Sequence, residues 1–237
     1  MARPNVLVFV TDGHRAGALG CYGNSFAQTP HFDALAAEGV RFEQAYCVHS
    51  VCMPTRASMV TGRYPQVHGV WANGIALRKG EVTLPQVLGE AGYATAACGK
   101  VHFEPQQPYG GVAPRIEGRY YGFDEVHLTE NTLGQEYLDW IEEQYPELAE
   151  TVRGREGVPE EAHELQWIAD RAIAFMSEQA QAERPFFCQC SFHELSPPCT
   201  PPPTFEGCFR TEDMPVPELR EEDLAGKPAF YRECYEG

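Results

Sequence analysis

Basic residues are scarce in this chain of 237 residues: 18 Lys and Arg stand against 34 Asp and Glu, which gives a formal net charge of −16. Nucleic acids and anionic membranes attract proteins with a basic face, so neither is expected as a partner. A small anionic substrate remains compatible with this charge, because a few cations in one pocket can outweigh acidic groups beyond the screening distance.

Long hydrophobic runs are also missing. The first apolar run follows Asn5 and ends at Val10; it is too short for a signal core or a membrane span and predicts a buried strand. The nine cysteines include no Cys-x-x-Cys pair, although Cys188 and Cys190 would share one face of a strand. We therefore expect a reduced, cytoplasmic protein rather than a disulfide framework or a structural zinc site.

What the chain does contain is an alternation of strand-like and helix-like runs, with 43% hydrophobic residues. This pattern favours an α/β fold with a mainly parallel sheet in a single domain over residues 1–237. Predicted strands cover residues 5–10, 40–46, 93–98 and 186–192, and predicted helices cover 29–39, 83–91 and 159–181. Residues 103–158 are expected to be largely irregular, and the proline-rich residues 195–217 to be an extended loop.

The expected helices carry their own boundary signals. Thr29 and Thr83 can cap helix starts, while Gly39 and Gly92 suit left-handed helix ends. One face of the helix predicted over residues 159–181 collects apolar side chains at helical spacing. These are Leu165, Ile168, Ala172, Phe175 and Met176.

Polar residues follow three of the predicted strands directly. Asp12 comes after the first, Lys100 and His102 come after residues 93–98, and His193 comes after residues 186–192. Ligands of open α/β sheets bind outside the carboxyl ends of the strands, so these side chains could converge on one crevice.

Residues 50–62 are the most informative segment. Pro54 suits a first helical turn, which places Cys52 at or near a helix N-terminus, where backbone N–H groups favour an anionic ligand or an acidified thiol. Arg56 lies one turn further and can brace that group. On this segment alone, a buried cysteine beside a surface arginine is an equally good interpretation. A thiol phosphatase is disfavoured by the short Cys–Arg spacing, and a cysteine hydrolase lacks an assignable histidine partner.

The pattern Cys52-x-Pro54-x-Arg56 resembles the sulfatase signature, the minimal element for conversion of cysteine to formylglycine, with Thr55 where the family usually has Ser. Further segments resemble the family in the same order. They are residues 11–15, 19–24, 29–30, 35–42, 61–65, 68–70, 99–102 and 212–217. The resemblance implies the N-terminal part of an alkaline-phosphatase-like α/β/α sandwich, truncated at the C-terminus, that hydrolyses a sulfuric ester.

The resemblance also implies a mechanism. A formylglycine-generating enzyme would convert Cys52, and one hydroxyl of the hydrated aldehyde would attack the sulfur of a small sulfated substrate; loss of the other hydroxyl's proton would expel sulfate. A divalent metal, calcium rather than magnesium, would be held by Asp12 and the modified Cys52. Arg56 would orient the formylglycine, while Lys100 and His102 would hold the sulfate oxygens and the formylglycine hydroxyl.

The chain departs from the family pattern at particular places. Gly13 stands where the family usually has Asp, Gln or Glu, and Ser196 stands where the substrate loop usually has His, although His193 is nearby. We expect His193 and Ser196 to bind substrate. The family's later metal-ligand pair has no counterpart before Gly237. Three alternatives stay open: a phosphonate or phosphate ester hydrolase of the same superfamily, a catalytically inactive fragment, and a binding protein in which Cys52 is merely buried.

Overall fold

The computed structural model describes residues 3–106, 111–131, 133–194, 199–214 and 220–236. The chain divides into two compact units, Met1–Phe205 and Glu206–Gly237. The first unit holds the whole sheet, and the second contains α8 (Ala229–Glu236). That residues 1–237 form a single domain stays a prediction.

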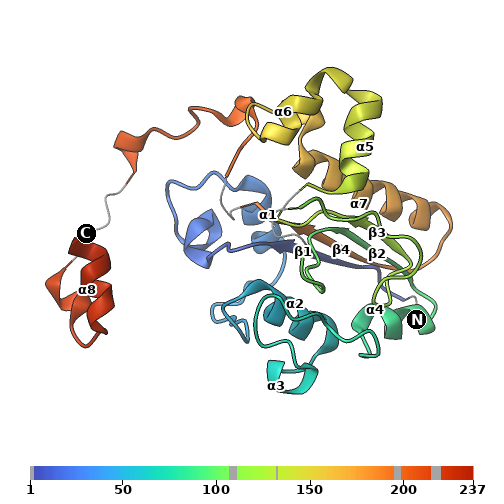
Figure 1. The fold of residues 1–237 in the computed structure, drawn as a ribbon, viewed down its shortest axis with the longest axis horizontal. Coiled ribbons are helices and arrows are strands. Elements are labelled where there is room, and N and C mark those ends of the chain that lie inside the picture. Colours follow the sequence, from blue (N-terminus) through green and yellow to red (C-terminus); the bar gives the residue numbers. More distant parts are fainter. Residues whose placement is uncertain (1–2, 107–110, 132, 195–198, 215–219, 237) are drawn as a thin grey trace. The chain divides into compact units, whose positions relative to one another are not determined.

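The centre of the first unit is a parallel four-stranded sheet (Figure 1). Its strands are β1 (Val6–Thr11), β2 (Ala94–Gly99), β3 (Glu125–Leu128) and β4 (Phe186–Phe192), in the order β1-β4-β2-β3. Because all neighbouring pairs are parallel, the four carboxyl ends meet at one edge, away from the N-terminus. The register pairs Thr11 with Phe192 and Gly99 with Ser191, so the residues that follow these strands start side by side.

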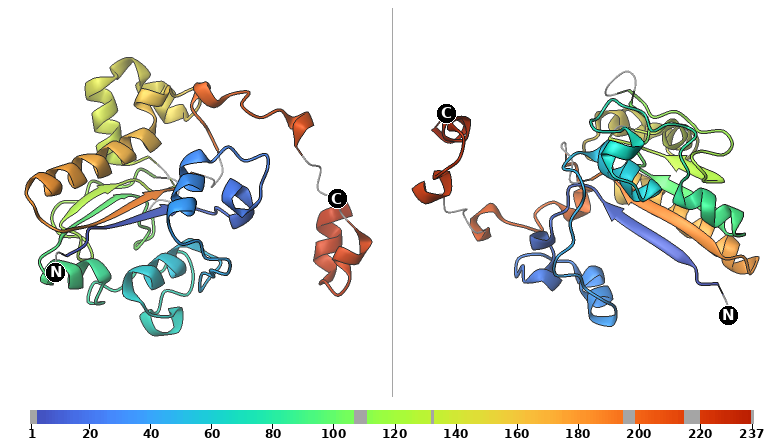
Figure 2. Two further views of the ribbon diagram at one scale, coloured as in Figure 1. Left: turned by 180° about the vertical axis from the view of Figure 1, so that it is seen from behind. Right: turned by 90° about the horizontal axis from the view of Figure 1, so that it is seen from below.

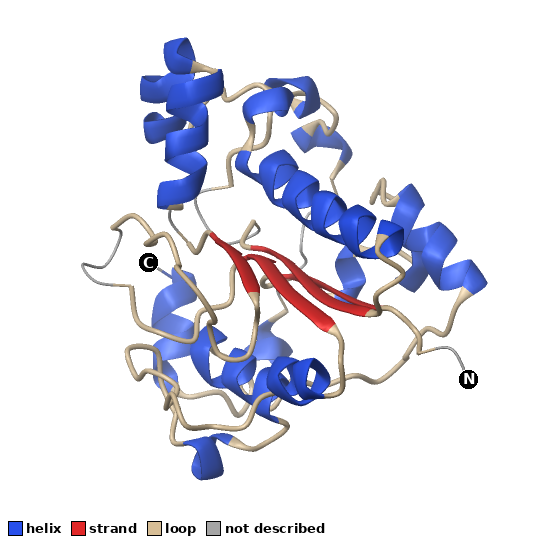
Figure 3. Ribbon diagram, turned by 90° about the vertical axis from the view of Figure 1, so that its right-hand side faces the viewer, coloured by secondary structure: helices blue, strands red, loops and turns tan. Residues whose placement is uncertain are grey.

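Helices cover both faces of the sheet (Figures 2 and 3). In Figure 1, α5 (Gln135–Gln144), α6 (Ala149–Gly154) and α7 (Glu164–Gln181) lie on one side of the sheet, and α2 (Cys52–Thr61), α3 (Pro65–His68) and α4 (Leu84–Glu90) lie on the other. A further helix, α1 (Pro30–Glu38), follows β1 in the chain. The arrangement is the expected α/β/α sandwich, since a parallel sheet buries both of its faces under crossover helices.

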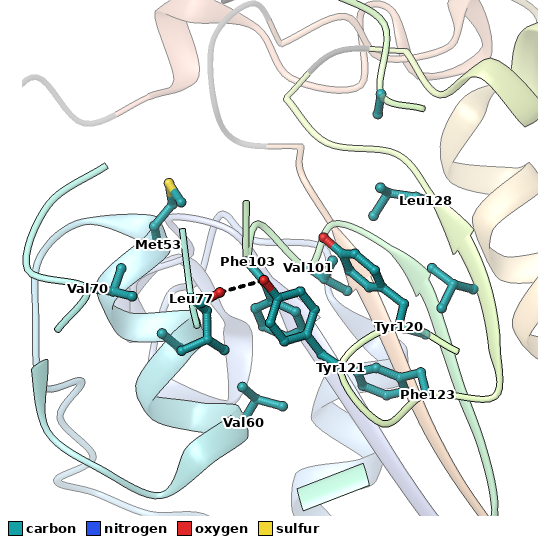
Figure 4. Close-up of a cluster of buried hydrophobic side chains, with 14 of the residues drawn as sticks. Met53, Val60, Val70, Leu77, Val101, Phe103, Tyr120, Tyr121, Phe123 and Leu128 are labelled. Atoms are coloured by element: carbon teal, nitrogen blue, oxygen red, sulfur yellow. Dashed lines mark hydrogen bonds between the residues drawn. The ribbon is translucent and has the colours of Figure 1, made fainter. Parts of the chain in front are cut away.

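The core consists of two apolar clusters on opposite faces of the sheet, because side chains alternate along each strand. Ala97 and Phe187 point toward α2 and α4, where Tyr121 Oη donates a hydrogen bond of 2.6 Å to the Leu77 carbonyl (Figure 4). Cys188 and Cys190 point together toward α7, as predicted from their spacing. The described cysteines form no disulfide.

Three predicted strands are confirmed to within one residue at each end, but the first was predicted to be buried, and β1 instead leaves Leu7 and Phe9 about half exposed. The strand predicted over residues 40–46 is wrong. The described chain is irregular there, and Val40, Phe42 and Tyr46 are highly exposed. A segment of β-branched and aromatic residues forms a strand only beside a partner strand that shares its backbone hydrogen bonds. Residues 40–46 have no such partner in the described sheet, in which the edge strand β1 pairs with β4 alone.

The helix signals had mixed outcomes. Thr83 caps α4 by accepting the N–H of Gln86, and Gly92 adopts the expected left-handed φ of 91°. Gly39 was misjudged: its φ is −114°, and Thr29 makes no side-chain cap. The hydroxyl of Thr29 instead accepts the N–H of Gly20, which competes with the capping bond. Helix α7 begins at Glu164, after a short 3-10 turn.

The prediction that residues 103–158 are largely irregular is also wrong. The stretch contains β3, which completes the sheet, and α5 and α6. Strand β3 is short and carries half-buried Glu125 and His127 between its apolar residues, so its pattern is too brief to recognise. Within residues 199–214 the chain forms only short 3-10 turns, as expected for a proline-rich loop.

Candidate active site at the carboxyl edge of the sheet

Cys52 is the first residue of α2, as the sequence predicted. Val51 before it is extended, with φ −118° and ψ 150°, and Gly62 ends the helix in the left-handed region. The N–H of Met53 donates to Asn73 Oδ1 at 3.0 Å, so a side chain from a later loop caps this helix start. The half-buried Cys52 thiol therefore faces the positive end of α2.

Arg56 lies one turn after Cys52 and is 6% exposed. Its guanidinium donates to the Lys100 carbonyl at 2.6 Å and to Ser191 Oγ at 2.8 Å. Its Nη2 lies 3.8 Å from Asp12 Oδ2. Arg56 thus ties α2 to the ends of three strands, and the surface-arginine interpretation does not hold.

Lys100 follows the last residue of β2 and is fully buried. Its ammonium group donates to Asp12 and to Asn131, and it lies 3.7 Å from Cys52 Sγ. The parallel topology therefore brings Asp12, Cys52 and Lys100 together although they are far apart in the sequence, as the strand-end pattern predicted.

The electrostatics of this cluster favour an anion. Arg56 and Lys100 supply two buried positive charges, Asp12 supplies one carboxylate between them, and burial raises the pKa of the nearby Glu130 carboxyl to about 7. A positive centre shielded from water stabilises a bound anion more strongly than exposed cations do. This local charge is the opposite of the acidic charge of the whole chain.

His102 lies next to this cluster with a left-handed φ of 52° and is 6% exposed. Its backbone N–H donates to Glu130 Oε1 at 2.8 Å. Burial, followed by the charges of Lys100 and Arg56, lowers the pKa of His102 to about 4. The imidazole is therefore neutral near pH 7, and its Nδ1 has no partner among the described residues.

His193 follows β4 but contacts a different group. Its Nε2 lies 3.3 Å from Glu164 Oε2, at the start of α7, and 3.7 Å from Glu194. Burial lowers the pKa of His193 to about 3 and raises that of Glu164 to about 8. The predicted partner residue Ser196 lies outside the described residues. Whether either residue binds substrate stays a prediction.

A cleft of about 350 Å³ opens in front of Cys52. Asp12, Cys52 and Arg56 line it together with His14, Arg15 and His49, which the sequence did not single out.

Asn131, Glu130 and Ser191 were also missed as site residues. Asn131 and Glu130 follow the carboxyl end of β3, so the same strand-end pattern would have found them had β3 been predicted. Ser191 lies inside β4, where only the contact with Arg56 distinguishes it.

The described residues do not fit a calcium or magnesium ion on their own. No group of three or more His, Cys, Asp or Glu side chains among them is arranged to hold a metal. Asp12 is the one carboxylate that lines the cleft within this part of the chain, and it already binds Lys100. Calcium takes about 6–8 oxygen ligands, which Asp12 and Cys52 cannot supply.

Comparison with known proteins settles the family. The model of the family described as Sulfatase matches residues 4–226, nearly the whole chain. The chain belongs to the sulfatase family. Members of this family generally use a divalent metal and a formylglycine.

Individual relatives of this sulfatase-family chain agree. It is 33% identical over 240 residues to the uncharacterized sulfatase YidJ of Escherichia coli, covering 98% of this chain and 46% of that protein. The solved phosphonate monoester hydrolase of Agrobacterium radiobacter is 25% identical with a TM-score of 0.74, over 90% of this chain and 45% of that one. BT4656, solved with its substrate D-glucosamine-2-N,6-O-disulfate, is 27% identical with a TM-score of 0.67, over 98% and 42%.

The chain thus spans about half the length of the relatives it matches. The solved neighbours confirm the alkaline-phosphatase-like fold expected from the resemblance. Within the described residues, no helix is both long enough and apolar enough to cross a membrane.

Proposed function

We propose that this protein is a sulfuric ester hydrolase whose nucleophile is a formylglycine formed from Cys52. One observation carries the proposal: Cys52 Sγ, at the start of α2, lies 3.7 Å from the ammonium group of a fully buried lysine beside Asp12. The hydroxyls of hydrated formylglycine would take the place of this sulfur. A nucleophile at this point lies beside two buried cations, Arg56 and Lys100, which suit the oxygens of a sulfate ester.

The surrounding side chains have separate tasks in this proposal. Lys100 neutralises the sulfate oxygens and favours a deprotonated hydroxyl at position 52. Arg56, fixed by two hydrogen bonds, orients the modified residue. His102 is neutral near pH 7, so it can donate or accept a hydrogen bond at the hydroxyl without adding charge to the site. His193 and Ser196 are assigned to the substrate side.

Two conditions accompany this proposal. The nucleophile requires a formylglycine-generating enzyme as partner. A divalent ion, calcium in preference to magnesium, would supply Lewis-acid polarisation of the sulfate when bound. Asp12 and the modified position 52 would be contacts of this ion, but they do not form a complete site among the described residues.

The free cysteines among the described residues support a reduced, cytoplasmic setting, which trapping of free thiols in intact cells would check.

A phosphonate or phosphate monoester is the alternative substrate, and the similarity to the Agrobacterium radiobacter phosphonate monoester hydrolase favours keeping it. A tetrahedral anion with a sulfur or phosphorus centre presents similar oxygens to Lys100 and Arg56. The two reactions therefore have to be separated by kinetics.

The test is turnover by the chain after co-expression with a formylglycine-generating enzyme, in excess calcium, of 4-nitrophenyl sulfate and of an aryl phosphonate monoester. We expect the larger kcat/KM with the sulfate, and none with Cys52→Ala. A larger kcat/KM with the phosphonate would replace the proposed substrate class. A modified Cys52 without any turnover would identify the chain as an inactive fragment.

A further inference from the structure

Glu130 is a carboxylate in an unusual place. It follows β3 by two residues and is 4% exposed. Its Oε1 accepts the backbone N–H of His102 at 2.8 Å, and the neighbouring backbone N–H of Val101 also lowers the pKa of the carboxyl group. A buried carboxylate that accepts a backbone N–H stabilises the backbone segment that donates it. That segment is the turn that carries Lys100 and His102.

The turn needs such a hold. His102 has a φ of 52°, a left-handed conformation that is unfavourable for a non-glycine residue. Backbone strain of this kind persists only where the surroundings enforce it. The hydrogen bond from His102 to Glu130 stabilises the left-handed turn against relaxation to a commoner conformation.

Asn131, the next residue, holds the side chain of the same turn. Its Oδ1 accepts from the Lys100 ammonium group, and its own carbonyl accepts from Arg155 Nη1 at 3.1 Å. Arg155 directly follows α6, so that end of the helix anchors Asn131. Glu130 therefore binds the backbone of the turn after β2, and Asn131 binds the ammonium group of Lys100 in the same turn.

We propose that Glu130 and Asn131 are positioning residues: Glu130 fixes the backbone of residues 101–102, and Asn131 fixes the ammonium group of Lys100 beside Cys52. They act through Lys100 and His102 rather than on the substrate. The catalytic consequence rests on the proposed function, whereas the hold on the turn does not.

Glutamine at position 130 is a matched probe. Burial raises the pKa of Glu130 to about 7, against the bond from His102 and the charges of Arg56 and Lys100. A Gln side chain has nearly the same shape and keeps one acceptor oxygen, whereas Ala removes it. Glu143→Ala is the control, because Glu143 is exposed on α5 and lies outside the site.

The first measurement is amide hydrogen exchange, read residue by residue by NMR. In Glu130→Ala the amide of His102 should exchange about 10–100-fold faster, because it loses its side-chain acceptor, and the amide of Val101 should also exchange faster. Glu130→Gln should restore much of the protection, and Glu143→Ala should match the wild type. The amides of β4 report global stability and should not change in step. Unchanged exchange at Val101 and His102 in Glu130→Ala would overturn the proposal.

The second measurement is turnover by the formylglycine form. Glu130→Ala should lower kcat by about 10–100-fold with little change in KM, because misplacing catalytic groups by about 1 Å costs this much. Asn131→Ala should act in the same direction, and Glu130→Gln should recover most of kcat. Wild-type kcat in both Ala variants would reject the catalytic consequence. If the wild type itself shows no turnover, the proposed function fails, while amide exchange still decides the hold on the turn.

Discussion

Lys100 is a fully buried lysine whose ammonium group is neutralised by Asp12 and held by Asn131. Lysine is rarely buried completely without a reason, since its charge must be paired. Arg56 alone, 3.8 Å from Asp12, leaves that carboxylate poorly paired if Lys100 is removed. The lysine therefore links stability to the site's charge.

Replacing Lys100 by Met should destabilise the protein by about 2–4 kcal/mol, because it leaves the Asp12 carboxylate, which is only 13% exposed, without its closest partner. Lys79→Met is the matched control. Lys79 also pairs with a carboxylate, Glu104, but is 69% exposed, so its loss should cost less than about 1 kcal/mol. Urea unfolding of both variants gives the comparison. Equal losses would mean that burial does not strengthen the Lys100 pair.

Glu164 makes a pH-dependent contribution that can be isolated by Glu164→Gln. Burial raises its pKa to about 8 from 4.5, so the folded state binds the proton more tightly than the unfolded state does. The stability associated with this group is thus complete below about pH 4.5 and is lost as pH rises toward about 8. The glutamine of Glu164→Gln does not titrate, so the variant should not lose this stability as pH rises.

The measurement is the free energy of unfolding of wild type and Glu164→Gln from about pH 5 to about pH 9, a range that covers the titration of Glu164. The difference should shift steadily in favour of the variant as pH rises and then level off. A difference independent of pH would contradict the shifted pKa. Glu143→Gln, which alters an exposed carboxylate of α5, should show no such trend.

At the scale of elements, the close approach of β2 and β4 places the site. Gly99 ends β2 with a φ of 88°, and a Cβ there would lie 1.9 Å from the Ser191 carbonyl oxygen of β4. The glycine that precedes Lys100 therefore allows the strands to meet where Ser191 and the Lys100 carbonyl both bind Arg56.

Gly99→Ala should consequently push the two strands apart and disrupt the fold or the site. Gly118→Ala separates sterics from backbone strain, because Gly118 also has a positive φ, of 73°, but nothing within 4 Å of the added Cβ. It should cost only about 1–2 kcal/mol. Thermal unfolding and circular dichroism of the two variants check the contrast. Similar losses of stability in the two variants would show that the positive φ alone explains why glycine is needed at position 99.

The element pattern also explains what could be predicted. The strand ends after β1, β2 and β4 were identifiable because short, mainly apolar runs are followed by polar residues, so Asp12, Lys100 and His193 were found. Strand β3 was missed because it is short and partly polar, and with it Glu130 and Asn131 were lost. The partner of His193 could not be predicted. Glu164 is the first residue of α7, and no spacing in the sequence indicates that it contacts His193.

At the scale of the first compact unit, the outer edge of the sheet stands out. Strand β1 pairs with β4 alone among the described residues, and its Leu7 and Phe9 are 48% and 50% exposed. A strand that has one free edge and exposed apolar side chains is a site for association with another chain.

We therefore expect the chain to self-associate in a concentration-dependent manner. Leu7→Lys should reduce this association, because a charge on an edge strand opposes pairing. Val82→Lys is the control, since Val82 is equally exposed, at 50%, but lies outside the sheet. Sedimentation velocity over a range of concentrations gives the result. Equal association of both variants and the wild type would show that the β1 edge is not responsible.

The whole account depends on the chemical state of Cys52, and mass spectrometry of the tryptic peptide from Phe42 to Arg56 tests it most directly. After co-expression with a formylglycine-generating enzyme, Cys52 should lose one sulfur and two hydrogens and gain one oxygen. Cys47, in the same peptide, should remain an alkylatable thiol and serve as the internal control. An unmodified thiol at Cys52 in folded, soluble protein would contradict the account and leave an anion-binding fold without its nucleophile.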